Sequence, residues 1–132
     1  MKYMILLYGN DRAWKEMAEW TPEEIQGMVA HMDKINNELT ANGEFVEANG
    51  LIGPAFYKVV RAGSDGSPDV TDGPFSESKE VLAGYWIVDV DNPARAYEIA
   101  AHASAAPGPG GKPLNMDIEV REVMGILLRD VP

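Results

Sequence analysis

The sequence predicts a mixed α+β domain built on one antiparallel sheet. Residues 2–8 and 81–90 are apolar runs of strand length, and residues 22–41 repeat apolar side chains at helical spacing. Shorter strand-like segments at 45–48, 56–61, 70–71 and 116–124 are separated by Gly, Pro and Asn turns. In chain order this gives β-α-β-β-(hairpin arm)-β-α-β. Without the insertion at about 55–71, the βαββαβ order of a ferredoxin-like fold remains.

The two strongest strands carry apolar side chains on both faces, which is typical of strands at the centre of a sheet. Residues 2–8 place Tyr3, Ile5 and Leu7 on one face, and Met4, Leu6 and Tyr8 on the other. Residues 81–90 alternate in the same way. Only two helices are expected, and both should pack on one face. A second copy of the chain is the simplest cover for the other face, which predicts a twofold homodimer.

Both helices have clear start signals. Thr21, Pro22 and Glu24 form a capping box with proline at the first helical position. Asn92 and Pro93 start a second helix that runs to about residue 104, whereas residues 10–20 are expected to be a loop with a helical turn. The side chains expected to face the core are Ile25, Met28, Val29, Met32, Ile35 and Leu39 in the first helix, and Ala94, Tyr97 and Ala101 in the second.

Length, charge and composition exclude several classes of function. The 132 residues fit a single domain, 1–132. The net charge of −10 disfavours nucleic acids and anionic membranes. The absence of cysteine excludes disulfides and thiolate sites, and two distant histidines make a poor metal site, so we expect no metal and no cofactor. The apolar start is too short for a signal peptide or a membrane span, which predicts a cytoplasmic protein.

The segment Asp72-Gly73-Pro74-Phe75 stands apart from the periodic segments and runs through residues 76–80 into the strand at 81–90. Here the chain resembles the YCII-related family with the Asp-Gly-Pro-Phe (DGPF) signature. The opening strand at residues 4–9, the helix end at 38–43 and the last strand at 118–121 resemble it as well. The resemblance implies a dimeric α+β barrel of two ferredoxin-like protomers. It implies no defined activity, although some family genes lie beside genes for extracytoplasmic-function sigma factors.

His31 and Asp72 are the candidate catalytic residues. His31 lies beside the apolar stripe of its helix, where a histidine could serve as an acid or a base, but a structural, partly buried histidine is at least as compatible with the pattern. Asp72 could act in proton transfer, although capping backbone N–H groups in a turn is the commoner use of such a residue. Phe75 is expected to fill the core, and Lys79, from the polar cluster before the strong strand, is a candidate for substrate binding.

Three further candidates for substrate binding lie on the sheet. Glu119 and Arg121 share one face of the last strand and should point toward the dimer cleft, alongside Tyr85. Arg121 could clamp a carboxylate, or it could pair with Glu119 to fix the register. Trp14 and Trp20 could line the mouth of a cleft, although packing is their commoner role.

These residues leave the function open between two classes, and the sequence does not decide whether the protein is an enzyme. An enzyme would perform acid–base chemistry without a cofactor on a small organic acid or lactone-like molecule. Its cleft would lie between the long helix and the sheet, or at the other sheet face, where two copies meet. The alternative is a non-catalytic binding or regulatory module, with a sigma factor as a possible partner. The role of the Pro/Gly-rich loop at residues 105–115 is also left open.

Overall fold

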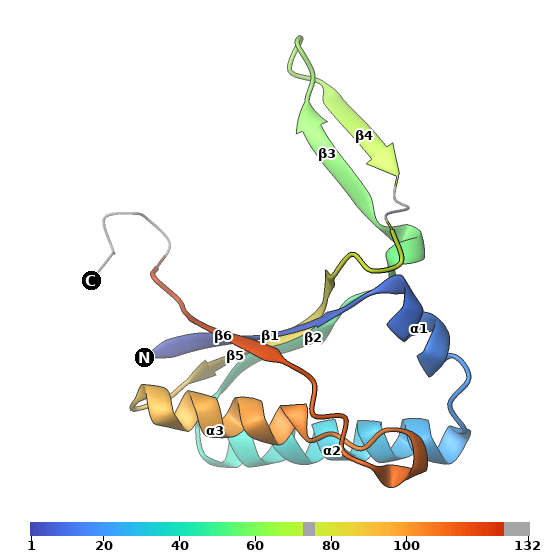
Figure 1. Ribbon diagram of the computed structural model, residues 1–132. Coiled ribbons are helices and arrows are strands. Elements are labelled where there is room, and N and C mark those ends of the chain that lie inside the picture. The colour runs from blue at the N-terminus through green and yellow to red at the C-terminus, as the bar shows by residue number, and fades with distance from the viewer. Residues whose placement is uncertain (73–75, 126–132) are drawn as a thin grey trace.

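The computed structural model describes residues 1–72 and 76–125 (Figure 1). Its main sheet is antiparallel, with the strand order β2-β5-β1-β6. These strands are β2 (Phe45–Gly50), β5 (Val81–Asp89), β1 (Lys2–Gly9) and β6 (Ile118–Glu122). The order and the two helical crossovers confirm the predicted ferredoxin-like α+β arrangement.

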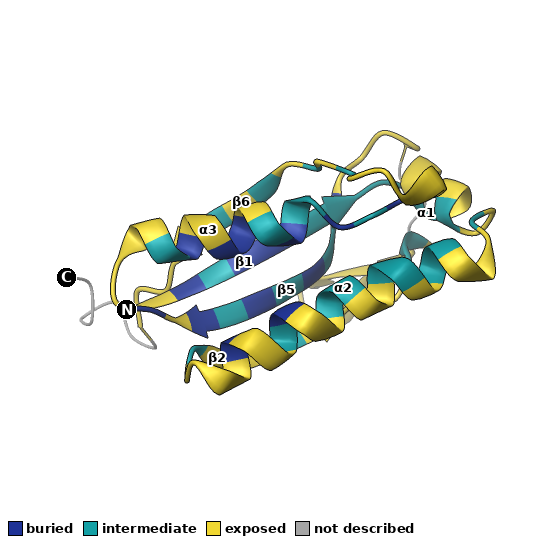
Figure 2. Cartoon of the chain, turned by 90° about the horizontal axis from the view of Figure 1, so that it is seen from below, coloured by how far each residue is buried: buried dark blue, intermediate teal, exposed yellow. Residues whose placement is uncertain are grey.

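The two long helices cover one face of this sheet, as Figures 1 and 2 show. They are α2 (Pro22–Ala41) and α3 (Pro93–Ser104), with the predicted starts: Thr21 and Glu24 form the capping box, and Asn92 caps α3. A third helix, α1 (Asp11–Met17), occupies the segment expected to be mainly loop. The side chain of Asn10 accepts a hydrogen bond from the Ala13 N–H at 2.8 Å, which fixes its first turn.

The face of the sheet toward the helices forms the core in rows that run across the strands. Val88 pairs with Tyr3 in one row. The next row is Ala48, Trp86, Ile5 and Val120, which are neighbours on four successive strands. Ile35 and Leu39 of α2 and Ile99 of α3 pack on these rows. The expectation that Tyr3, Ile5 and Leu7 face one side together is therefore confirmed.

The inward faces of the helices differ in part from the prediction. In α3 the buried residues are Ala96, Ile99, Ala100 and Ala103, and the predicted Ala94, Tyr97 and Ala101 are exposed. That prediction is wrong because alanines fill this helix, so two stripes have helical spacing and only Ile99 distinguishes them. Val29 of α2 is also exposed rather than packed on the core.

The hairpin arm is formed by β3 (Lys58–Ala62) and β4 (Pro68–Asp72), which pair only with each other among the described strands. Figure 1 shows it extending away from the main sheet, on the side opposite the helices. Every residue of both strands is exposed. Phe75, expected in the core, and the apolar tail from residue 126 onward lie outside the described residues.

A partly buried ion pair joins α3 to the turn before β2. The guanidinium of Arg95 donates from Nε and Nη2 to the two carboxylate oxygens of Glu44, each at 2.9 Å. The side chains of Arg95 and Glu44 are 26% and 14% exposed. The hydrogen bond from Arg95 lowers the pKa of Glu44. This two-point contact holds α3 against the end of α2, beside the core.

We predict that Glu44→Gln lowers the free energy of unfolding by about 1–2 kcal/mol at pH 7, because it replaces a charged two-point contact with a neutral one. The pKa of Glu44 is lowered in the folded state, so its contribution is complete above the ordinary carboxyl pKa. It is lost as pH falls through the lowered value. Urea unfolding at pH 7 and at about pH 3 measures both effects.

Glu98→Gln is the matched control, because Glu98 contacts Arg95 at 3.3 Å from a side chain that is 67% exposed. Its effect should stay within about 0.5 kcal/mol. Equal losses for the two variants, or a loss for Glu44→Gln that does not shrink in acid, would contradict this assignment.

Candidate ligand-binding cavity

A cavity of about 550 Å³ lies between α2 and the sheet, next to the last row of large core side chains. Beyond the row that contains Trp86, the next row is Gly50, Gly84, Leu7 and Ile118. The two glycines leave the sheet without side chains beneath α2, so the helix and the sheet cannot fill the space between them. A Cβ on Gly84 would lie 3.0 Å from the carbonyl oxygen of Asn49, whereas one on Gly50 would meet no atom within 4 Å.

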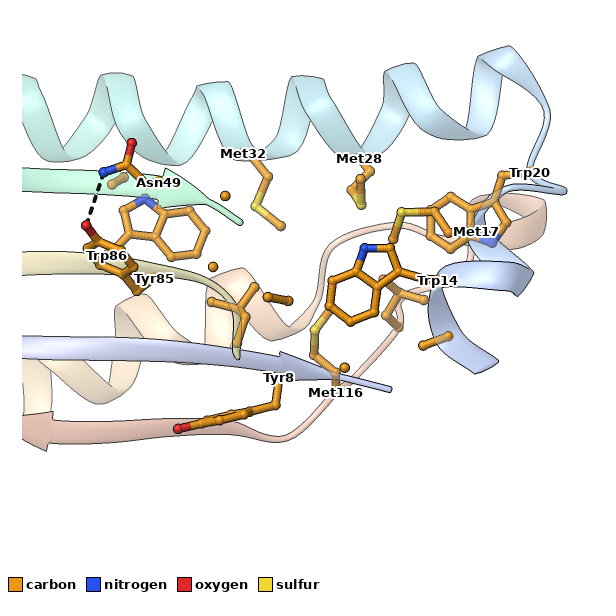
Figure 3. Close-up of a pocket in the computed structure, with 18 of the residues that line it drawn as sticks. Tyr8, Trp14, Met17, Trp20, Met28, Met32, Asn49, Tyr85, Trp86 and Met116 are labelled. Atoms are coloured by element: carbon orange, nitrogen blue, oxygen red, sulfur yellow. Dashed lines mark hydrogen bonds between the residues drawn. The ribbon is translucent and has the colours of Figure 1, made fainter. Parts of the chain in front are cut away.

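Aromatic and sulfur-containing side chains form the walls. All three tryptophans of the chain, Trp14, Trp20 and Trp86, line the cavity. Four of the seven methionines do so too: Met17, Met28, Met32 and Met116. Figure 3 shows Met28 and Met32 pointing from α2 toward the sheet, with Trp86 at one end of the cavity and Trp20 at the other. Trp14 and Trp20, which the sequence offered as possible cleft residues, both line this cavity.

Two of the indole rings are held by specific contacts. Gly9 lies against the six-membered ring of Trp14, where a Cβ would come within 2.7 Å of Cζ3. Gly53 lies against the five-membered ring, where a Cβ would come within 2.9 Å of Cδ1. The Nε1–H of Trp86 donates to Oδ1 of Asn36 on α2 at 2.6 Å. The rings of Trp14 and Trp86 therefore have defined positions in the unliganded protein, which limits the entropy lost on binding.

The loop at residues 105–115 closes one side of this cavity. Its 3₁₀ turn, η2 (Pro109–Gly111), is tied to the start of α2, because the N–H of Gly110 donates to Oε2 of Glu24 at 2.7 Å. The backbone N–H groups of Thr21 and Gly110 lower the pKa of Glu24, which favours its charged form. Leu114 and Met116, which follow η2, contribute to the cavity wall. The loop thus positions apolar side chains over the end of the sheet.

Charge is sparse around the cavity. Glu16 of α1 is the single ionic side chain among the lining residues that the structure describes, and these include no lysine or arginine. The side chain of Glu16 forms no hydrogen bond or ion pair with the described residues, whereas its backbone carbonyl accepts from the Glu19 N–H at 3.0 Å. Its neighbour Lys15 is paired with Asp11 at 2.9 Å and with Glu77 at 3.3 Å.

Three of the sequence-predicted residues lie together on the opposite, open face of the sheet. Tyr85 and Glu119 both pair with Leu6, and Arg121 pairs with Met4. The hydroxyl of Tyr85 donates to Glu47 at 2.6 Å and accepts from the Nδ2 of Asn49 at 3.1 Å.

At the other edge of that face, Tyr8, which borders the cavity (Figure 3), lies near Glu119. Partial burial and Glu119 raise the pKa of Tyr8, and the charge of Arg121 opposes this. The open face therefore has an apolar centre with a polar group at each edge.

The other three predicted residues lie apart from both places. His31 packs between α2 and α3, with Nε2 2.7 Å from the carbonyl oxygen of His102 and the two rings in a T-shaped contact. Asp72 ends β4, is exposed and accepts a hydrogen bond from Lys58. Lys79 lies 5.7 Å from the centre of the Tyr57 ring. None of the three lines the cavity.

The glycines and the methionines of the cavity were not predicted from the sequence. Gly50 was interpreted as a chain breaker and Gly84 as part of a strand, although a glycine within a strand often marks a close approach or a site. Met28 and Met32 were assigned to the core stripe of α2. A stripe that ends in methionine rather than in leucine or isoleucine was the available signal.

In the described parts of the chain, no three His, Asp or Glu side chains lie close enough together to hold a metal ion. No described helix is long and apolar enough to cross a membrane.

Gly9→Ala should change the tryptophan emission spectrum and lower the free energy of unfolding by about 1–3 kcal/mol, because the added methyl group displaces the indole of Trp14. Gly50→Ala, whose methyl group meets open space, should leave both nearly unchanged. Emission spectra and urea unfolding of the two variants measure this. If the variants behave alike, Trp14 is not held as described.

Comparison with known proteins agrees with this architecture. A family model described as the YCII-related domain matches residues 1–124. An uncharacterized protein of Rhizobium meliloti (strain 1021) is 26% identical over 106 residues, which cover 80% of this chain and 82% of that protein. The match spans β1 to β6 and so includes the strands and helices that enclose the cavity. The chain belongs to the YCII-related domain family.

Proposed function

We propose that this protein binds a small organic molecule in the cavity that is enclosed by α1, α2 and the part of the sheet around Gly50 and Gly84. The observation that carries the proposal is a cavity of about 550 Å³ with all three tryptophans in its walls. Ligand sites in proteins are commonly concave, mostly apolar and of this size. A site whose rings are already fixed loses little conformational entropy on binding.

The proposal is limited to binding, because the candidates for proton transfer do not meet at the cavity. His31 and Asp72 lie elsewhere, and Glu47 and Tyr85 form their 2.6 Å hydrogen bond between neighbouring strands. A catalytic role for His31, Asp72 or Lys79 would require a substrate placed outside the cavity. Acid–base chemistry at the open face, with Tyr85, Glu119 and Arg121 as substrate-binding residues, is the second candidate, favoured by their position on that face.

We also propose that the protein acts as a homodimer through the open face. The chain exposes 8882 Å², whereas a folded monomer of this mass exposes about 7,000 Å². The excess, roughly 1,900 Å², is about twice the ~800 Å² that one partner of a standard interface buries. Every residue of the hairpin arm is exposed, and two-stranded ribbons of this kind are at best marginally stable when nothing covers them.

The side chains of the open face suit a twofold interface. Ile87 and Met4 are neighbours at its centre, between Glu47 on edge strand β2 and Arg121 on edge strand β6. A twofold axis parallel to the strands would place the β2 edge of one copy over the β6 edge of the other. Glu47 would then face the partner copy's Arg121, so the charges at the two edges are complementary.

Gly50→Leu tests the binding proposal. The leucine side chain is expected to occupy part of the cavity, and its Cβ would meet no protein atom within 4 Å. A fragment panel that contains neutral, cationic and anionic aromatic molecules is screened by tryptophan emission and thermal shift. We expect the wild type to bind members of the panel and Gly50→Leu to lose at least about tenfold in affinity for them, while its free energy of unfolding is maintained or raised. Equal binding by both proteins would contradict the site.

The dimer proposal predicts that Ile87→Lys separates the copies, because it places an unpaired charge at the centre of the interface. Val29→Lys makes a similar change on an exposed part of α2 and should stay dimeric. Sedimentation velocity at about 10–100 µM distinguishes them, with circular dichroism as a check of folding. A wild type that is monomeric at the highest concentration would rule the dimer out.

A further inference from the structure

We infer that the cavity selects flat aromatic molecules without a negative charge, and that a positive charge on the ring strengthens binding. This inference rests on the proposed function and names the ligand class for the same cavity. It departs from the organic acid that the sequence suggested, because the arginine expected to anchor a carboxylate lies on the other face of the sheet.

The walls favour an aromatic ligand. Trp14 presents its indole ring from α1, Trp20 from the turn before α2 and Trp86 from β5, and the methionines that line the cavity with them supply sulfur atoms. Aromatic rings interact favourably both with other rings and with thioether sulfur. Gly50 and Gly84 form a part of the floor without side chains beneath α2, against which a flat molecule can approach the backbone closely. Branched aliphatic molecules would match the volume but not these contacts.

The charges disfavour an anion. No lysine or arginine is among the described residues that line the cavity, so a ligand carboxylate or phosphate would lose its water without gaining a cationic partner. The chain as a whole carries a net charge of −10, which repels anions before they reach the cavity.

The same charges favour a cation. Glu16 is the charged member of the lining, and it has no ion-pair partner in the described chain. The faces of indole rings attract cations more strongly than do other aromatic side chains. A ring with a delocalised positive charge could therefore use Glu16 and a tryptophan together. Lys15 does not compensate for Glu16, because Asp11 and Glu77 already pair with it.

Three molecules of nearly the same shape test the inference by calorimetry on the full chain at pH 7.5: 1-methylquinolinium, 1-methylnaphthalene and 1-naphthoate. We expect the cation to bind roughly threefold to tenfold more tightly than the neutral molecule. The anion should bind at least about tenfold more weakly than the neutral molecule. An anion that binds as tightly as the neutral molecule would overturn the inference and leave the binding proposal intact. Failure of all three to bind would count against the proposed function itself.

Glu16→Gln and Glu19→Gln provide a matched pair, because each removes one negative charge from neighbouring turns of the chain and Glu19 does not line the cavity. Glu16→Gln should reduce the preference for 1-methylquinolinium over 1-methylnaphthalene, and Glu19→Gln should keep it. An equal reduction in both variants would mean that the overall charge, rather than Glu16, sets the preference. That result would overturn the assignment to this site.

Discussion

The absence of side chains at Gly50 and Gly84 is the constraint on which the candidate site depends. Elsewhere on the helix-covered face, each row of the sheet supplies apolar side chains that α2 and α3 cover. Gly50 and Gly84 contribute no side chains to the next row, although α2 extends over them with Met28 and Met32. Close packing, the normal condition of a protein interior, therefore fails locally. The surrounding tryptophans line the resulting space without filling it.

The two faces of the sheet carry different features. Its helix-covered face holds the core and the cavity, and its open face carries a hydrophobic centre between polar edges. A ligand on one face and a second copy on the other would not compete for the same side chains. The arm of β3 and β4 extends on the open side, where a second copy would reach it (Figure 1). This division explains why Glu119 and Arg121, chosen by sequence for a dimer cleft, do not line the cavity, whereas Tyr85 borders it.

The fold was largely predictable because its signals are local. The capping box of α2, the Asn92 cap of α3, the proline that starts each of these helices and the apolar runs of β1 and β5 are each local signals, and the chain order then leaves few topologies. The site was less predictable because it is defined by what is missing. The sequence presents Gly50 and Gly84 as two distant glycines, and only the pairing of β2 with β5 brings them into one row. The prediction of the inward face of α3 was wrong for a related reason. Alanines on several sides of this helix leave too little difference in hydrophobicity between its faces to show which one is buried.

Methionine methyl NMR tests the central claim most directly, because the seven methionines sample both faces of the sheet. The protein is labelled with ¹³C-methyl methionine and titrated with 1-methylquinolinium. Binding in the cavity should shift the signals of Met17, Met28, Met32 and Met116 and leave that of Met4, on the open face, in place. Shifts confined to Met4, with the four cavity signals unchanged, would place the ligand on the other face of the sheet and contradict the account.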